Sequence, residues 1–219
     1  VDRSDLDITY GSSSPSVVIK STASVDVVFT LSETPLENPV VKLAGTKTKT
    51  APSNVTGLTY TYTFNDLSGI TDGEKGVTIT AADGSGNSIT EDFTGPLFDR
   101  SAPTVVSKNV APAVVNKDAT QIMVSFTFSE KMTALTNGNV TVSPSGLPAH
   151  NCTTADNQSY SCTVDVSALG TDKDGSYTYS VSGSDQYGNA MSSAETIGQV
   201  EVDRSDLDIT YGSSSPSVV

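Results

Sequence analysis

The sequence predicts an all-β fold made of two tandem β-sandwich domains, and three observations lead to this prediction. Apolar and small polar residues alternate along many short runs, the pattern of strands with one buried face. Gly, Pro, Asn and Asp interrupt these runs every eight to twelve residues. A set of short motifs near the start of the chain also returns roughly 100 residues later, the usual length of a seven-strand sandwich. Together these features predict two immunoglobulin-like domains.

The expected strands are the clearest of the alternating runs. Their polar positions are largely Thr and Ser, and β-branched Thr suits the exposed face of a strand. Helical periodicity is nearly absent apart from short pieces such as Val166–Leu169. Neither domain contains Trp or the inter-sheet disulfide spacing of antibody domains, which excludes the antibody subfamily. The runs are residues 24–33, 58–66, 76–83, 121–130, 139–144 and 176–185.

The first 18 residues, Val1–Val18, return without a change as Val202–Val219. An identity this long indicates a copied unit, because convergence on a fold requires only a shared pattern. The sequence therefore predicts a tandem array with a period of 201 residues, in which residues 202–219 form the first strand of the next repeat. Such arrays provide length, spacing or multivalency, so we expect a stalk whose partners are the neighbouring repeats. A further expectation is head-to-tail self-association, with 202–219 of one molecule replacing 1–18 of another.

A weaker repeat inside this period sets the domain boundary. Three motifs recur in both halves: Asp-Arg-Ser, Phe-Thr-x-Ser-Glu and Asp-x-x-Gly-Asn. Their recurrence predicts two homologous domains, residues 1–98 and 99–201, followed by the start of the next repeat. The motifs lie within residues 2–4, 28–33 and 83–87 in the first domain and within residues 99–101, 125–130 and 185–189 in the second.

The chain is strongly acidic, with 25 Asp and Glu residues against 12 Lys and Arg and a net charge of −13. Such a surface repels nucleic acid and anionic membranes, and it attracts cations. No apolar run is long enough to cross a membrane, so no membrane insertion by this segment is expected. The acidity fits both solubility at a crowded cell surface and the binding of divalent ions, and composition alone does not separate the two.

Cys152 and Cys162 are the two cysteines of the chain. They lie in two short runs of strand character around the polar turn Asp156–Gln158, so their thiols could face each other across a hairpin. A disulfide is the expectation for a secreted chain, and two buried free thiols are the alternative. A zinc site is not expected, because C-x-x-C spacing and partner histidines are missing.

Three motifs of the second domain, taken in order, resemble a known family. The linker Asp99–Pro103, the strand that ends in Phe-Ser-Glu at Glu130, and the turn that starts at Asp185 are similar to those of bacterial Ig-like domains. These are the repeated modules of giant surface adhesins and biofilm-associated proteins. The resemblance covers both domains, although the first linker lacks the proline. It implies an extracellular extender on the bacterial surface that serves adhesion or biofilm formation, with structural Ca²⁺ near the domain junctions.

The positions of acidic residues give the same expectation independently. In a seven-strand sandwich the start of the first strand, the B–C loop and the F–G loop lie at one pole, and the E–F loop lies at the other. Carboxylates at one pole should converge, and clustered carboxylates are the oxygen ligands that calcium prefers. The candidate metal ligands are Asp99, Glu130 and Asp185 in the second domain, Asp2, Glu33 and Asp83 in the first, and Asp66, Asp72, Asp172, Asp174 and Asp203 at the opposite poles.

Two alternatives to calcium remain open at these positions. Asp-x-x-Gly-Asn also forms a tight turn, in which Asp accepts hydrogen bonds from backbone amides and Gly supplies a positive φ. The Arg that follows each linker Asp, namely Arg3, Arg100 or Arg204, can also neutralise that Asp in an ion pair.

No catalytic constellation is evident in the sequence. The single histidine, His150, has no evident acid or nucleophile partner, and no phosphate loop or cofactor fingerprint occurs, so we expect no enzyme. Besides the extender, two functions are retained: a self-assembling extracellular filament joined by strand exchange, and a module that binds a glycan or a protein. The absence of Trp and the placement of most Tyr residues within strands disfavour the binding module.

Overall fold

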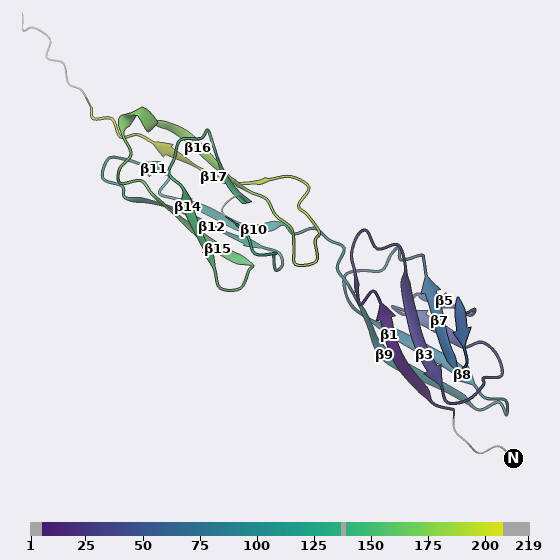
Figure 1. Ribbon diagram of the computed structural model, residues 1–219. Coiled ribbons are helices and arrows are strands. Elements are labelled where there is room, and N and C mark those ends of the chain that lie inside the picture. The colour runs from purple at the N-terminus through teal and green to yellow at the C-terminus, as the bar shows by residue number, and fades with distance from the viewer. Residues whose placement is uncertain (1–5, 137–138, 208–219) are drawn as a thin grey trace, which may run out of the picture. The chain divides into compact units, whose positions relative to one another are not determined.

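The computed structural model describes residues 6–136 and 139–207, and nearly all of its regular structure is β-strand (Figure 1). The chain forms two compact units, with the main boundary between Ser101 and Ala102. Each unit contains two sheets, which confirms the predicted all-β, immunoglobulin-like class. Asp2 and residues 208–219 lie outside the described residues, so the strand predicted at the end of the chain stays a prediction.

The first unit has one sheet of order β1-β3-β7-β6 and a second of order β2-β9-β8-β4-β5. Its first strand is shared between the sheets. β1 pairs antiparallel with β3, whereas β2 pairs in parallel with β9, so the chain crosses from one layer to the other. The strands are β1 (Ile8–Ser14), β2 (Val17–Val18), β3 (Val25–Leu31), β4 (Val40–Leu43), β5 (Lys47–Lys49), β6 (Asn54–Thr56), β7 (Thr59–Phe64), β8 (Gly73–Ala82) and β9 (Ser88–Phe98).

The second unit has a similar topology, with sheets of order β10-β12-β15-β14 and β11-β17-β16-β13, the latter having four described strands where the first unit has five. Its first strand is divided in the same way, because β10 pairs antiparallel with β12 and β11 pairs in parallel with β17. One turn of 3₁₀-helix, Thr171–Lys173, precedes β16. The strands are β10 (Val105–Ala111), β11 (Val114–Val115), β12 (Gln121–Phe128), β13 (Val140–Ser143), β14 (His150–Thr154), β15 (Ser159–Asp165), β16 (Gly175–Val181) and β17 (Glu195–Val202).

Each unit has its own hydrophobic core between its two sheets. In β3 and β12, fully buried residues alternate with residues that are more accessible, as the period-two pattern predicts. Aromatic rings fill equivalent places in the two cores: Phe29 stacks on Tyr60 with ring centroids 5.7 Å apart, and Phe126 stacks on Tyr160 at 5.6 Å. Each fully buried large side chain contributes about 1.5–3 kcal/mol, so the alternating strands supply most of the stabilisation of each sandwich.

Cys152 and Cys162 form a disulfide between neighbouring strands. The two residues lie directly opposite each other in the register of β14 and β15. This confirms the predicted bridge over the alternative of two free thiols. A loop this short contributes roughly 2–3 kcal/mol when it is closed. The bridge also fastens β14, the edge strand of its sheet, to β15.

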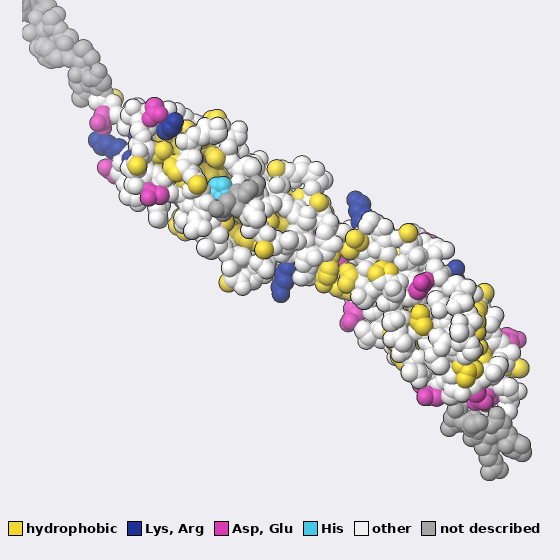
Figure 2. All heavy atoms as spheres, in the orientation of Figure 1, with side chains coloured by type: hydrophobic (Ala, Val, Ile, Leu, Met, Phe, Trp, Pro, Cys, Tyr) yellow, Lys and Arg dark blue, Asp and Glu magenta, His cyan; other side chains and the backbone are white. Residues whose placement is uncertain are grey.

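The surface carries charge at scattered positions. On the face drawn in Figure 2, Asp and Glu side chains lie singly over both units. Large exposed apolar side chains, including Leu36, Val106 and Met123, are also present on the surface. Within the part of the chain that the structure describes, no helix is long and apolar enough to span a membrane.

Candidate metal centre

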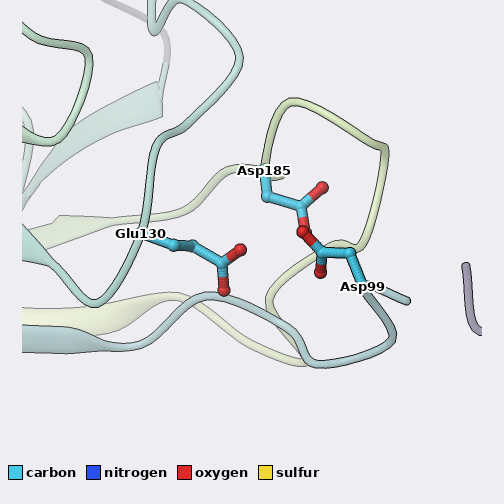
Figure 3. A group of neighbouring side chains, drawn as sticks. All are labelled: Asp99, Glu130 and Asp185. Carbon is cyan, nitrogen blue, oxygen red and sulfur yellow. The ribbon is translucent and has the colours of Figure 1, made fainter. Parts of the chain in front are cut away.

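Asp99, Glu130 and Asp185 each place one carboxylate oxygen within 4.8 Å of the other two (Figure 3). Asp99 follows the end of β9, Glu130 follows β12, and Asp185 lies in the loop between β16 and β17. In Figure 3 the side chains of Asp99 and Asp185 meet, and that of Glu130 points toward them. Asp185 is fully buried, and the other two are partly buried. The three acidic residues expected to converge in the second domain therefore lie together.

Hydrogen bonds hold the loops that carry two of these carboxylates. Thr133 donates its hydroxyl to the carbonyl of Asp185 at 2.7 Å. The side-chain amide of Asn189 donates to both the carbonyl and the Oδ1 atom of Asp99, at 3.0 and 3.1 Å. Gly188 has a φ of 91°, which an L side chain rarely adopts, so the turn requires the Gly of Asp-x-x-Gly-Asn. The motif thus shapes its turn and also holds the linker aspartate.

This arrangement suits a divalent cation bound through oxygen. Calcium takes six to eight oxygen ligands at about 2.3–2.6 Å, so two oxygens on one ion are at most about 5 Å apart. The three carboxylate oxygens meet this limit. Three like charges at such distances repel one another unless a cation neutralises them. The residues present therefore fit calcium, and main-chain carbonyls or water would complete the coordination.

The corresponding turn of the first unit is arranged differently. Asp83 is fully buried, and its carboxylate accepts hydrogen bonds from the amides of Ser85 and Asn87 at 2.8 Å and from the Asn87 side chain at 2.6 Å. These bonds, chiefly that of the Asn87 side chain, hold the pKa of Asp83 below its usual value. Asp83 therefore serves its own turn. Glu33 has a buried Oε1 atom without a hydrogen-bond partner.

Asp72 holds the segment that leaves the first unit. Its two carboxylate oxygens accept the backbone amides of Arg100 and Ser101 at 3.0 and 3.1 Å. The guanidinium of Arg100 donates to the carbonyl of Leu67 at 2.9 Å. Burial raises the pKa of Asp72, but the hydrogen bonds from Ser101 and Arg100 outweigh it, so the pKa lies below its ordinary value.

Asp174 makes the same contact in the second unit. Its carboxylate accepts the backbone amide of Arg204 at 2.8 Å and the hydroxyl of Ser205. The bond from Ser205 and then that from Arg204 lower the pKa of Asp174. The guanidinium of Arg204 donates to the carbonyls of Val166 and Lys117, each at 3.0 Å.

We call these two contacts the linker clamps: Asp72 with residues 100–101, and Asp174 with residues 204–205. In both clamps an Asp stands immediately before a strand that begins with Gly, and it binds the Asp-Arg-Ser tripeptide that follows the last strand of the unit. In both, the Arg guanidinium donates to main-chain carbonyls of the same unit. The sequence carries no signal for the clamps beyond the recurrence of Asp-Gly and Asp-Arg-Ser in each domain.

The other acidic candidates make separate local contacts. Asp66 accepts a hydrogen bond from Lys47 Nζ at 2.7 Å, Asp172 lies 3.1 Å from Lys173 Nζ, and Asp203 accepts the amide of Ser205 at 3.3 Å. Across residues 6–136 and 139–207, the group of Asp99, Glu130 and Asp185 is the one set of three or more acidic, His or Cys residues placed to share an ion. The metal-binding role of every candidate stays a prediction.

Similarity to known proteins is found among solved structures. No family model and no curated protein sequence matches this chain. Among solved structures, similarity extends to a 1.5-MDa bacterial ice-binding adhesin studied for host cell surface retention, with a TM-score of 0.47 and 23% identity over 93% of this chain and 67% of that chain. A Ca²⁺-stabilised adhesin with which an Antarctic bacterium binds ice gives a TM-score of 0.40 and 22% identity over 91% of this chain and 49% of that chain.

The D00-D0 domain of intimin gives a TM-score of 0.38 and 15% identity, over 90% of this chain and 99% of that chain. Of the Antarctic adhesin chain described above, this chain spans about half the length. At these levels of identity the similarity concerns the β-sandwich fold alone, and function has to be argued from the residues of this chain.

Proposed function

We propose that this chain is a structural extender segment of a bacterial cell-surface adhesin, which separates a distal binding region from the cell in adhesion or biofilm formation. The observation that carries the proposal is the unchanged return of Val1–Val18 at Val202–Val219. A tandem array accounts for it, because each junction in such an array needs the same segment. The disulfide between Cys152 and Cys162 supports an oxidising, extracellular location.

The duplicated segment is described in two settings, and their difference supports an array. Leu6, in the first copy, is 4% exposed and belongs to the core of the first unit. Leu207, at the same place in the second copy, is 88% exposed. Burying such a side chain contributes about 1.5–3 kcal/mol. We infer that in a longer chain residues 202–219 enter a following sandwich as residues 6–18 enter the first.

The linker clamps support an extender that resists bending. Each clamp attaches the outgoing Asp-Arg-Ser tripeptide to the unit before it. Residues Leu6 and Ile8, which follow the same tripeptide, are buried in the unit after it. A junction that is short and held on both sides has fewer conformations than a flexible linker, which favours a semi-rigid rod.

Calcium is the proposed stiffening ion. The three carboxylates of Asp99, Glu130 and Asp185 support a site for it. By the internal repeat, Asp2, Glu33 and Asp83 are the proposed equivalent in the first unit. Calcium sites of extracellular modules bind with dissociation constants of about 0.1–1 mM, so millimolar calcium would occupy half or more of such a site.

A chain with two periods tests the array directly. In residues 1–201 fused to a second copy of residues 1–201, we expect the amides of the internal copy of Ile8–Ser14 to exchange slowly, because they would pair with the following copy of β3. Hydrogen exchange read by mass spectrometry on peptides that begin before the fusion point isolates this copy. The control replaces the second copy, after its first 18 residues, by a Gly-Ser segment of equal length. Equal exchange in the two chains would contradict the proposal.

A further inference from the structure

A shallow groove of about 500 Å³ lies on the sheet β10-β12-β15-β14 of the second unit. Ten residues line it, and seven of these are Ser or Thr. None of the lining residues is charged, although the chain has a net charge of −13. The groove is therefore a neutral, hydroxyl-rich surface on an acidic protein.

The register of the sheet arranges the hydroxyls in rows across neighbouring strands. Ser125 on β12 lies opposite Ser161 on β15, which lies opposite Thr153 on β14. In the next outward-facing row, Thr127 lies opposite Ser159. Because adjacent strands are about 4.8 Å apart, each row presents hydroxyls at regular short intervals.

Several of these hydroxyls have no partner in the protein. Within the described residues, no hydrogen bond engages the side chains of Ser107, Ser125 or Ser161. The hydroxyl of Thr153 makes only a long contact of 3.4 Å, to the carbonyl of Ser161. A hydroxyl group both donates and accepts, so this row offers donors and acceptors side by side.

On the equivalent face of the first unit, four hydroxyl groups are bonded to one another in two pairs. Thr30 and Thr59 are hydrogen-bonded to each other at 3.0 Å, and Thr63 donates to Ser53 at 2.8 Å. These residues lie on β3, on β7 and just before β6, the counterparts of β12, β15 and β14. The row that matches Ser125, Ser161 and Thr153 holds Val28, Thr61 and Asn54 in the first unit, with a single hydroxyl group. The row of three hydroxyl groups is therefore a feature of the second unit.

A fixed hairpin forms one wall of the groove. The disulfide joins its strands β14 and β15. In its turn, the carboxylate of Asp156 accepts the backbone amides of Gln158 and Ser159 at 2.8 Å each. The carboxylate of Asp156 is thus hydrogen-bonded within the turn, and the wall is held by covalent and hydrogen bonds. A wall held in this way loses little conformational freedom when a ligand binds.

We propose that this groove binds a segment of a neutral polysaccharide. Polyhydroxylated chains match a surface of open donors and acceptors, whereas an apolar ligand would leave the Ser hydroxyls unpaired. The acidic protein repels polyanions. The rings of Phe126 and Tyr160 are at most 4% exposed, so no aromatic platform adds stacking, and a single groove binds only in the millimolar range. Repetition of the unit would raise the avidity of such a weak site.

Titration of the ¹⁵N-labelled chain with maltohexaose and cellohexaose tests the proposal, with hexagalacturonate as the anionic comparison. We expect at least one neutral probe to shift the amide signals of Ser125, Ser161 and Thr153. Ser161→Glu should weaken binding roughly tenfold or more. Thr61→Glu, the matched change on β7 of the first unit, should leave it unchanged.

The dispersion of the amide spectrum shows whether each variant is folded. If Ser161→Glu does not fold, Ser107→Glu on the edge strand β10 is the second variant. Two results would overturn the proposal: no shift at the groove with either neutral probe at millimolar concentration, or binding that survives both Glu substitutions. Equal binding of hexagalacturonate would also overturn it, because the proposal requires a neutral ligand.

Discussion

Calcium is expected to raise the melting temperature of the second unit by about 6–11 °C. A ligand that binds only the folded state at about 10 times its dissociation constant stabilises by about 1.4 kcal/mol. For a domain of this size, each kcal/mol shifts the melting temperature by about 4–8 °C. Scanning calorimetry in EDTA and in millimolar calcium measures the effect. Magnesium should give a smaller shift, because it requires shorter, octahedral coordination and gives up its water reluctantly.

A substitution of Glu130 separates the calcium site from general charge effects. Glu130→Gln should remove most of the calcium-dependent shift, because it takes one of the three carboxylates from the site. Glu201→Gln, on the exposed side of β17, is the control and should keep the full shift. An unchanged melting temperature with calcium, together with no heat of binding in titration calorimetry, would contradict a calcium role.

Loss of the Arg204 side chain is expected to destabilise the second unit more than loss of Arg100 destabilises the first. Arg204 donates to the carbonyls of Lys117, Ala119 and Val166, whereas Arg100 donates to that of Leu67. A hydrogen bond from a charged group contributes about 1.5–3 kcal/mol, and several from one side chain are not additive. We expect Arg204→Ala to lower the free energy of unfolding by about 3–4 kcal/mol and Arg100→Ala by about 1.5–2 kcal/mol.

Urea unfolding followed by circular dichroism measures both variants. Lys117→Ala is the control: Lys117 pairs with Asp206 on the exposed surface, so its loss should cause no measurable change. Equal destabilisation by Arg204→Ala and Arg100→Ala would count against the asymmetry of the clamps. No effect from either would show that the linker is not held.

The stability that the linker clamps give to the folded state depends on pH. The pKa values of Asp72 and Asp174 lie below the ordinary value, so the carboxylates stabilise the folded state above the unfolded Asp pKa of about 3.9. This stabilisation is lost as the pH falls through their lowered folded values. Asp174→Asn should imitate that loss at neutral pH and speed the exchange of the Arg204 amide.

The strands and the disulfide follow from local pattern. The alternation of apolar and polar residues along 24–33 and 121–130 predicts strands with one buried face. In β3 and β12 the apolar positions are indeed the buried ones. The hairpin that joins Cys152 to Cys162 could be predicted from the sequence, because its turn residues separate two short runs of strand character. In each case residues close together in the sequence hold the relevant information.

The sequence could not predict that one motif makes different contacts in the two domains. Asp-x-x-Gly-Asn occurs in both domains, yet Asn87 bonds to Asp83 of its own turn and Asn189 bonds to the distant Asp99. The choice depends on which segment packs beside the turn, and a local pattern carries no such information. The clamp of Asp72 on Arg100 was missed for the same reason, because it joins residues from different loops.

Length as a function of copy number is the most direct test of the extender role. Chains of one, two and three periods, each ending in residues 1–18, can be measured in calcium by small-angle X-ray scattering. An extender predicts that the maximum dimension rises by the same increment with each added period. A radius of gyration that grows only as about the 0.38 power of the residue number, as for a compact globule, would contradict it.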